Sequence, residues 1–300
     1  MSASRAGAEA ITKLDHPGQA LGRVTAVIIN YNSGPWLARC LRALKGKGAR
    51  YPDVIVLDNA SDDDSLENLP DMPGLRIIKA EKNLGFGRGV NHVLEQVDRE
   101  YLLIVNPDCL LVPEGLVSLV AELDAHPEAG LVSGRIFDMS GNEQRGSRRQ
   151  LPGPRRVLNE VIRFRGGNGV DLTHMPAPMT PGEVEAVSGA CMLLRTKAFR
   201  QLNGFDPGYP MHFEDLDLMA RLARAGWTVR LEPSVAISHA GGISSRRSPV
   251  RVMISKHRGL WRYLNKHCHD RWPAWSRPLW WLAIWGHAML MIPIALWRRQ

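Results

Sequence analysis

The sequence contains little cysteine, and none of its cysteines are closely paired. The four cysteines lie far apart and form no CxxC motif, so the sequence indicates neither a zinc site nor a disulfide framework. We therefore expect a reducing compartment, of which the cytosol is the simplest. Residues 1–22 carry charges throughout and contain no apolar core, which argues against a secretory signal peptide.

The common nucleotide-binding and nucleic-acid-binding motifs are also missing. No GxxxxGK[ST] sequence occurs, which excludes a P-loop enzyme. Gly85, Gly87 and Gly89 have the spacing GxGxG instead of GxGxxG and follow the wrong strand for a dinucleotide-binding fold. A net charge of +8 suits an anionic partner, but no helix-turn-helix, zinc-finger or RNP-like pattern supports nucleic acid. A nucleotide, a phosphorylated acceptor or a membrane surface fits better.

What the chain does contain is a regular alternation of apolar runs and segments with helical spacing. With 300 residues, 44% of them hydrophobic, it can fill the core of one large α/β domain or two small ones. The runs at residues 24–29, 54–57 and 101–105, and the segment Leu75-Arg76-Ile77-Ile78, read as strands. Strands that alternate with helices predict βαβ units and a mostly parallel sheet.

Each of these strands ends in polar residues. Right-handed crossovers bring the carboxyl ends of parallel strands to one edge of a sheet, so we expect the polar residues to meet in one crevice. Asparagine and aspartate are ordinary turn residues as well, but four such ends together favour a binding site. The residues concerned are Asn30, Tyr31, Asp58, Asn59, Asn83, Asn106 and Asp108.

Asp108 is the most informative of these residues. Pro107 cannot donate a ladder hydrogen bond, so the fourth strand stops there and presents the next carboxylate on a stiff connection. A carboxylate in that position can hold a divalent cation that neutralises phosphate. The alternative is that Asp108 only caps the helix expected from Pro113.

The second half of the chain adds a basic segment. Gly, Pro and Arg dominate residues 138–185, with seven arginines between Arg145 and Arg165. Such a stretch is typical of a mobile functional loop or a weakly ordered insertion. Its arginines either grip a diphosphate or form a solvated basic face.

Further candidates follow this segment. Ser188 and Gly189 interrupt an apolar run, as though backbone must approach a ligand there. Glu214, Asp215 and Asp217 open a helix, and the helix dipole explains only part of such a carboxylate cluster. A short strand ends at His239. A lone histidine is more often structural than a ligand, although this one also ends a strand.

The C-terminal tail is almost wholly apolar. Residues 279–297 are interrupted only by Gly286, His287 and Pro293 and are flanked by arginines. Since a bilayer span needs about 20 apolar residues, we predict an interfacial or re-entrant membrane segment, helped by the many tryptophans. The alternative is a terminal helix buried in a homodimer.

Taken in order, these motifs resemble glycosyltransferase family 2, and they are especially similar to bacterial rhamnosyltransferases of cell-wall linker and O-antigen assembly. The resemblance runs from about residue 24 to 239. It rests on Ile28-Ile29-Asn30-Tyr31-Asn32, Asp58-Asn59-Ala60-Ser61-Asp62, Asn83-Leu84-Gly85-Phe86-Gly87, Asn106-Pro107-Asp108, Ser188-Gly189-Ala190, Gly204-Phe205-Asp206 and Glu214-Asp215-Leu216-Asp217-Leu218.

The resemblance implies a GT-A fold, a nucleotide-sugar donor, a divalent metal (Mg²⁺ or Mn²⁺) and inversion at the anomeric carbon. It gives Tyr31 and Asp58 contacts to the base and ribose. The other nucleotide-sugar contacts it implies are Asn30, Asn59, Asn83, Arg88, Asn106 and Asp108. It places Ser188, Gly189 and Glu214 near the donor sugar or acceptor.

The resemblance also implies the reactive groups. Asp215 matches the catalytic base, Asp108 matches the last aspartate of the DxD metal motif, and His239 matches a histidine that completes the metal shell in some members. Asn106 replaces the first aspartate of DxD, so metal affinity is expected to be weaker or to rest more on His239. A base on one face and a neutralised diphosphate on the other suit direct displacement at a sugar carbon.

We therefore expect an inverting transferase at the cytoplasmic membrane face that moves L-rhamnose from dTDP-L-rhamnose to a polyprenyl-diphosphate-linked saccharide. A UDP- or GDP-sugar transferase with another acceptor, and a non-catalytic nucleotide-binding protein, are the alternatives. The expected organisation is a flexible N-terminus (1–22), a GT-A domain (23–245) and C-terminal helices (246–300). The GT-A domain divides into a nucleotide-binding half (23–137), a basic insertion (138–186) and an acceptor half (187–245).

Overall fold

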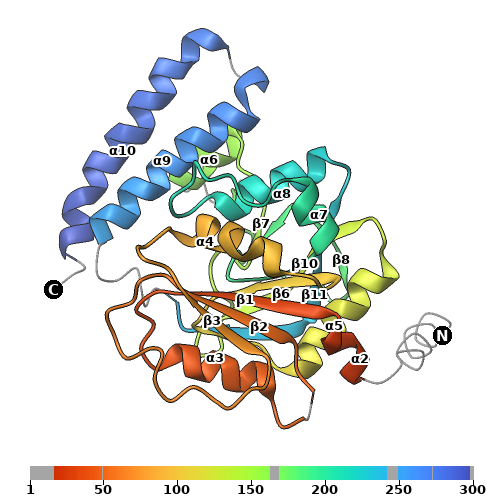
Figure 1. The fold of residues 1–300 in the computed structure, drawn as a ribbon. Coiled ribbons are helices and arrows are strands. Elements are labelled where there is room, and N and C mark those ends of the chain that lie inside the picture. The colour runs from red at the N-terminus through yellow and green to blue at the C-terminus, as the bar shows by residue number, and fades with distance from the viewer. Residues whose placement is uncertain (1–16, 49, 163–168, 242–248, 272, 298–300) are drawn as a thin grey trace.

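The fold is built on a nine-stranded sheet with helices on both faces (Figure 1). The computed structural model describes residues 17–48, 50–162, 169–241, 249–271 and 273–297. The strands of the sheet are β1 (Val24–Asn30), β2 (Asp53–Asp58), β3 (Leu75–Lys79), β4 (Tyr101–Val105), β5 (Cys109–Leu110), β6 (Ala129–Phe137), β8 (Gly182–Val184), β10 (Cys191–Arg195) and β11 (Thr228–His239). A separate pair consists of β7 (Arg148–Arg149) and β9 (Ala186–Val187).

The strand order is β3-β2-β1-β4-β10-β6-β11-β5, and β8 pairs with β11. The four strands predicted from the first half of the sequence are confirmed, and they pair in parallel. β10 then runs antiparallel between β4 and β6, while β11 is parallel to β6 and antiparallel to β5 and β8. The sheet is therefore mixed, and its β3-β2-β1-β4 half is parallel throughout.

The helices cover both faces of this sheet (Figure 1). They are α2 (Pro17–Gly22), α3 (Trp36–Lys45), α4 (Phe86–Val93), α5 (Pro113–Ala125), α6 (Pro154–Ile162), α7 (Thr196–Gln201), α8 (Glu214–Arg224), α9 (Pro249–His267) and α10 (Arg277–Trp297). Short 3₁₀ turns lie at Leu94–Gln96, His269–Arg271 and Ala274–Ser276.

The alternation of side chains along β1 explains the two core layers. Val27 and Ile29 pack in the layer with α4, α7 and α8, whereas Ala26 and Ile28 pack in the layer with α3 and α5. Every residue of β1 is buried, as expected for a parallel strand covered on both faces. Burying each large aliphatic side chain contributes about 1.5–3 kcal/mol, so these layers fix the strand ends that carry the polar residues.

The N-terminal segment differs from the prediction where it is described. Residues 17–22, expected to be flexible, form α2, and Ala20 and Leu21 are buried in the core layer with α5. The prediction of flexibility is therefore wrong for these residues, because two apolar side chains anchor the short helix. Residues 1–16 lie outside the described part of the chain.

The basic segment is more structured than a mobile loop. It contains β7, α6 and β8, and carboxylates hold several of its arginines. Arg148 Nε lies 2.8 Å from Glu143 Oε1 and is buried, while Arg156 Nη1 lies 2.5 Å from Glu185 Oε2. A uniformly solvated basic face does not describe these side chains. Arg163 and Arg165 lie outside the described residues.

The C-terminal helices α9 and α10 pack side by side at the edge of the domain (Figure 1). α9 also contacts α8, and Asp206 anchors it through Arg262 (3.0 Å) and Lys266 (2.5 Å). Among the described residues, no helix combines the length and the apolar character that a membrane crossing requires.

Candidate active site

Asn30, at the end of β1, organises the first loops of the site. Its side chain is fully buried, and its Nδ2 donates to Asp58 Oδ1 at 2.9 Å and to Ser65 Oγ at 2.8 Å. Ser33 Oγ in turn donates to Asn30 Oδ1 at 2.5 Å. The amide therefore joins the loops after β1 and β2, and Tyr31 follows it in a partly buried position.

Asn59 joins the loops after β2 and β3 in the same way. Its Nδ2 donates to Asn83 Oδ1 at 3.0 Å, and its Oδ1 accepts from the backbone N–H of Leu84 at 2.7 Å. The next residue, Gly85, has φ of +84°, and a Cβ there would lie 2.8 Å from the carbonyl oxygen of Pro210. Only glycine fits this close approach. The predicted convergence of polar strand ends is thus present for the first three strands.

Arg88 lies beside these loops and is exposed, but its guanidinium is engaged. Nε and Nη2 donate to the carbonyl oxygen of Pro207 at 3.0 and 2.9 Å. The contact links α4 to the turn before α8, which lies 119 positions further along the chain.

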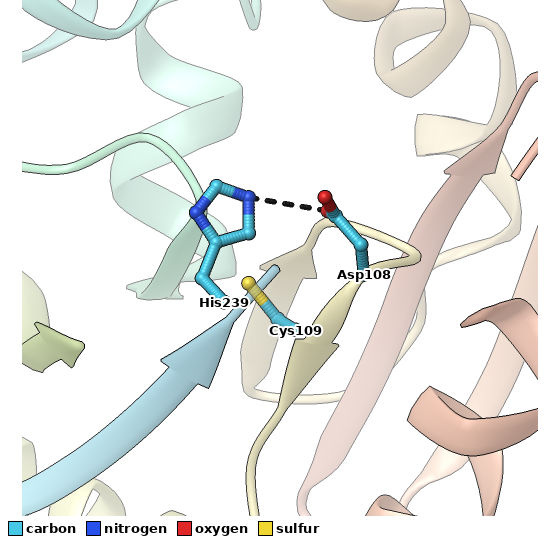
Figure 2. Close-up of side chains that lie close together, drawn as sticks. All are labelled: Asp108, Cys109 and His239. Carbon is cyan, nitrogen blue, oxygen red and sulfur yellow. Dashed lines mark ion pairs between the residues drawn. The ribbon is translucent and has the colours of Figure 1, made fainter. Parts of the chain in front are cut away.

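Asp108 and His239 face one another across the ends of β5 and β11 (Figure 2). Asp108 Oδ1 lies 3.1 Å from His239 Nε2, and its Oδ2 accepts from the backbone N–H of Gly241 at 3.0 Å. Asn106 Nδ2 lies 3.5 Å from the same imidazole nitrogen. The fourth strand end and the distant His239 therefore lie together, as the resemblance implied.

Gln144, which sequence reasoning missed, fixes the tautomer of His239. Its side chain makes two contacts with that residue: Nε2 donates to the main-chain carbonyl oxygen of His239 at 2.6 Å, and Oε1 lies 2.8 Å from Nδ1. A carbonyl oxygen can only accept, so the amide nitrogen must face it and Oε1 must face the ring. Nδ1 therefore carries the hydrogen, and the lone pair of the neutral ring lies on Nε2, toward Asp108.

These donor atoms fit a divalent cation. Two acceptor atoms 3.1 Å apart, Asp108 Oδ1 and His239 Nε2, repel unless a cation or a proton lies between them. Adjacent ligands of octahedral Mg²⁺, with bonds of about 2.1 Å, lie about 3.0 Å apart. A histidine oriented through its other ring nitrogen is the usual arrangement of a metal ligand.

The third side chain of this group is the thiol of Cys109 (Figure 2). Burial raises its pKa well above the ordinary value, and Sγ donates to the carbonyl oxygen of Ala190 at 3.3 Å. A protonated thiol is a poor ligand, and Mg²⁺ and Mn²⁺ prefer oxygen, so Asp108 and His239 suit such a cation better than Cys109 does.

Asp215 lies at the start of α8 and is held by three donors. Oδ2 accepts from Arg149 Nη2 at 2.5 Å and from the Gly189 N–H at 3.1 Å, while Oδ1 accepts from the Leu216 N–H at 2.8 Å. Burial alone would raise the pKa of Asp215, but the charge and hydrogen bond of Arg149 hold it below the usual range. Asp215 is therefore a carboxylate at neutral pH, as a base must be.

Gly189 allows this carboxylate to approach the backbone. A Cβ on Gly189 would lie 2.8 Å from both Cβ and Oδ2 of Asp215, which is closer than side chains pack. The interruption of the apolar run at Ser188 and Gly189 thus admits Asp215 itself. Ser188 Oγ accepts from the Ala190 N–H at 3.2 Å.

The turn before α8 is conformationally strained. His212 and Phe213 are consecutive non-glycine residues with φ of +64° and +70°, a region that costs energy for such side chains. Ser255 Oγ of α9 donates to the Met211 carbonyl oxygen at 2.7 Å, and burial lowers the pKa of His212 to about 4. The turn presents Glu214 and Asp215 at the N-terminus of the helix.

The three carboxylates of this helix start have different surroundings. Burial, followed by the adjacent charge of Asp215, raises the pKa of Glu214. Asp217 is fully buried and points toward α9, where Lys266 Nζ and His267 Nε2 lie 2.8 and 2.7 Å from its Oδ1. Asp217 therefore joins α8 to α9. This contact, and not the dipole of α8, accounts for the third carboxylate of the cluster.

A comparison with known proteins identifies the family. The model of glycosyl transferase family 2 matches residues 25–202, more than half of the chain. The chain belongs to glycosyl transferase family 2. It is thus a glycosyltransferase, as the resemblance implied.

Curated relatives match most of the chain. The N-acetylglucosaminyl-diphospho-decaprenol L-rhamnosyltransferase of Mycobacterium tuberculosis is 30% identical, with 91% of this chain and 95% of that protein covered. Rhamnosyltransferase WbbL of Escherichia coli K12 is 26% identical, with 81% and 93% covered.

Solved structures show the same fold. The mannosyltransferase PcManGT from Pyrobaculum calidifontis, in complex with GDP-Man and Mn²⁺, is 21% identical with a TM-score of 0.55, and 91% of this chain and 72% of that chain are covered. GalNAc-T7 with UDP, GalNAc and Mn²⁺ is 14% identical with a TM-score of 0.58, with 82% and 48% covered. The fold is thus the GT-A kind that the resemblance implied.

Proposed function

We propose that this glycosyltransferase moves L-rhamnose from dTDP-L-rhamnose to a polyprenyl-diphosphate-linked saccharide, with inversion at the anomeric carbon. The observation that carries the chemistry is the separation of two acidic sites. Asp215 is a carboxylate held by Arg149 and backbone donors, and Asp108 faces His239 in a different loop pair. The rhamnose donor and lipid-linked acceptor are supported by the relative that is 30% identical over most of both chains.

In the proposed reaction, Asp215 removes the proton of the acceptor hydroxyl. Its carboxylate still has lone pairs free after accepting its three hydrogen bonds, and one of them receives this proton as the oxygen attacks the anomeric carbon. A single displacement inverts that carbon. Asp108 and His239 would hold Mg²⁺ or Mn²⁺, which supplies Lewis-acid neutralisation of the leaving nucleoside diphosphate.

We propose that the nucleotide lies over the polar ends of β1 to β3. Tyr31 and Asp58 contact the base and ribose, and Asn83 is exposed beside them. The side-chain amides of Asn30 and Asn59 are hydrogen-bonded to neighbouring loops. Their part in nucleotide binding is therefore to fix the shape of the pocket. Arg88 contributes to nucleotide binding while its guanidinium keeps its hydrogen bond to the Pro207 carbonyl oxygen.

We propose that α10 lies on the cytoplasmic face of the membrane, where the lipid-linked acceptor is found. Large apolar side chains are exposed along α10 and the turn before it, and Arg251, Lys256 and Arg258 of α9 are exposed nearby in the same helix pair. This combination suits anionic lipid. The exposed apolar residues are Trp275, Leu279, Trp281, Leu282, Met289 and Leu290.

A donor screen by thermal shift tests the nucleotide part of the proposal. dTDP-L-rhamnose with Mg²⁺ or Mn²⁺ should raise the melting temperature more than UDP- or GDP-sugars do, since a ligand that binds the native state stabilises it by mass action. Stabilisation by UDP- or GDP-sugars alone would support the alternative donor class. Donor binding with no turnover on any acceptor would favour a non-catalytic nucleotide-binding protein.

A further inference from the structure

Arg149 lies in the basic segment, yet its side chain is built into the site of the base. β7 pairs with β9, and this places Arg149 opposite Ala186. Its Nη2 donates to Asp215 Oδ2 and to the Val187 carbonyl oxygen, each at 2.5 Å. The side chain is only 17% exposed and that of Asp215 only 14%, so the pair is largely shielded from water.

The carboxyl group of Glu214, adjacent to Asp215, has different surroundings. Its Oε2 is enclosed and has no hydrogen-bond partner among the described residues. Burying an ionised carboxylate is costly when one of its oxygens lacks a hydrogen-bond partner, whereas a neutral carboxyl group is tolerated. The adjacent Asp215 has an arginine and two backbone N–H donors.

We propose that Arg149 is a positioning residue that places the negative charge of the Glu214–Asp215 pair on Asp215 and orients this carboxylate toward the acceptor hydroxyl. The inference rests on the proposed role of Asp215 as the base. The position of the Arg149 guanidinium decides which carboxyl group carries the charge. It contacts Asp215, and its hydrogen bond to the Val187 carbonyl oxygen holds it there.

Other charged groups around Asp215 do not substitute for Arg149. His212 lies within electrostatic reach of Asp215, but burial lowers its pKa to about 4, so it is neutral at neutral pH. Lys256 of α9 lies within electrostatic reach of His212, and its side chain is exposed, so solvent screens its charge. The charge of Glu214 would oppose that of Asp215.

The test is the pH dependence of sugar transfer by Arg149→Met. In the wild type, Asp215 stays ionised to low pH because Arg149 holds its pKa down, so the acid limb of kcat/KM lies at low pH. Without the guanidinium, burial raises the pKa of Asp215 and nothing from Arg149 opposes it. The acid limb of kcat/KM should therefore move upward by about one to three pH units. Arg149→Lys keeps the charge and should restore most of the wild-type limb.

The matched control is Arg156→Met. Arg156 belongs to the same segment and makes an ion pair of the same length, 2.5 Å to Glu185, but it does not touch Asp215. Its pH profile should equal that of the wild type, and nucleotide binding by each variant reports whether it is folded. An unchanged limb in folded Arg149→Met, or an equal shift in Arg156→Met, would overturn the proposal.

A second background separates charge placement from a structural role. Glu214→Gln removes the rival carboxyl group, so Arg149→Met should lose less activity at neutral pH in that background than alone. Equal losses in both backgrounds would contradict charge placement. Absence of transfer from dTDP-L-rhamnose by the wild type would overturn the proposed donor instead, and the pH series would then use the donor and acceptor that the wild type accepts.

Discussion

Gln144→Leu is expected to weaken metal binding although Gln144 is not a ligand. The substitution removes two hydrogen bonds: the one that His239 Nδ1 donates to Oε1 (2.8 Å) and the one that Nε2 donates to the His239 carbonyl oxygen (2.6 Å). His239 can then rotate or carry its hydrogen on Nε2, the nitrogen that faces Asp108. Loss of such a supporting contact typically costs 10–100-fold in metal affinity, which is about 1.4–2.7 kcal/mol.

The assay is titration calorimetry of Mn²⁺ in the presence of dTDP. Gln201→Leu is the matched control, because it removes an amide that accepts a hydrogen bond from Trp227 Nε1 at 2.9 Å, outside the contacts of the Asp108–His239 pair. Gln144→Glu retains an acceptor for Nδ1 and should keep most of the affinity. Wild-type affinity in Gln144→Leu would refute the argument that the tautomer of His239 matters.

Two further predictions concern stability and membrane binding. Asp217→Asn should destabilise the fold by about 3–5 kcal/mol in chemical unfolding, because Arg221, Lys266 and His267 lose a buried anion. The ion pairs of Asp217 hold its pKa below the usual range, so the ionised carboxylate stabilises the wild type fully above the unfolded pKa of about 4. Below that pH, the difference in the free energy of unfolding between wild type and Asp217→Asn should shrink. A difference that stays constant with pH would count against this. Leu282→Glu combined with Leu290→Glu, at side chains 59% and 76% exposed, should reduce co-sedimentation with anionic vesicles at least about tenfold, whereas Leu158→Glu on α6 should not. Unchanged sedimentation would contradict the membrane face, and conversion of a dimer to monomer by the same pair would favour the dimer alternative.

Much of the fold was accessible from local patterns. Largely apolar runs identified β1, β2 and β4, since strands buried on both faces must be apolar. β3 lies at the edge of the sheet, contains Arg76 and is partly exposed. Polar residues directly after those runs located Asn30, Asp58 and Asp108 at one edge. The direction of β10 was not accessible, because alternation and hydrophobicity do not distinguish a parallel strand from an antiparallel one.

The residues that orient the reactive groups were not predicted individually. Gln144 contacts His239 across 95 positions of sequence and Arg149 contacts Asp215 across 66, and neither lies in a periodic pattern. Arg149 was one of seven arginines in a segment without periodicity, so composition indicated a charge but not its partner. Dipole effects explained only part of the cluster of Glu214, Asp215 and Asp217, and the partners of Asp217 on α9 could not be read from the sequence.

The central claim is tested most directly by sugar transfer in a defined system. Wild-type protein, dTDP-L-rhamnose labelled in the sugar, Mn²⁺ or Mg²⁺ and a short-chain polyprenyl-diphosphoryl-N-acetylglucosamine should yield a labelled lipid product. Asp215→Asn should abolish this product while dTDP binding, measured by calorimetry, stays at the wild-type level. Product formation by Asp215→Asn at the wild-type rate would contradict the account of the base, and no labelled product from the wild type would contradict the assigned donor and acceptor.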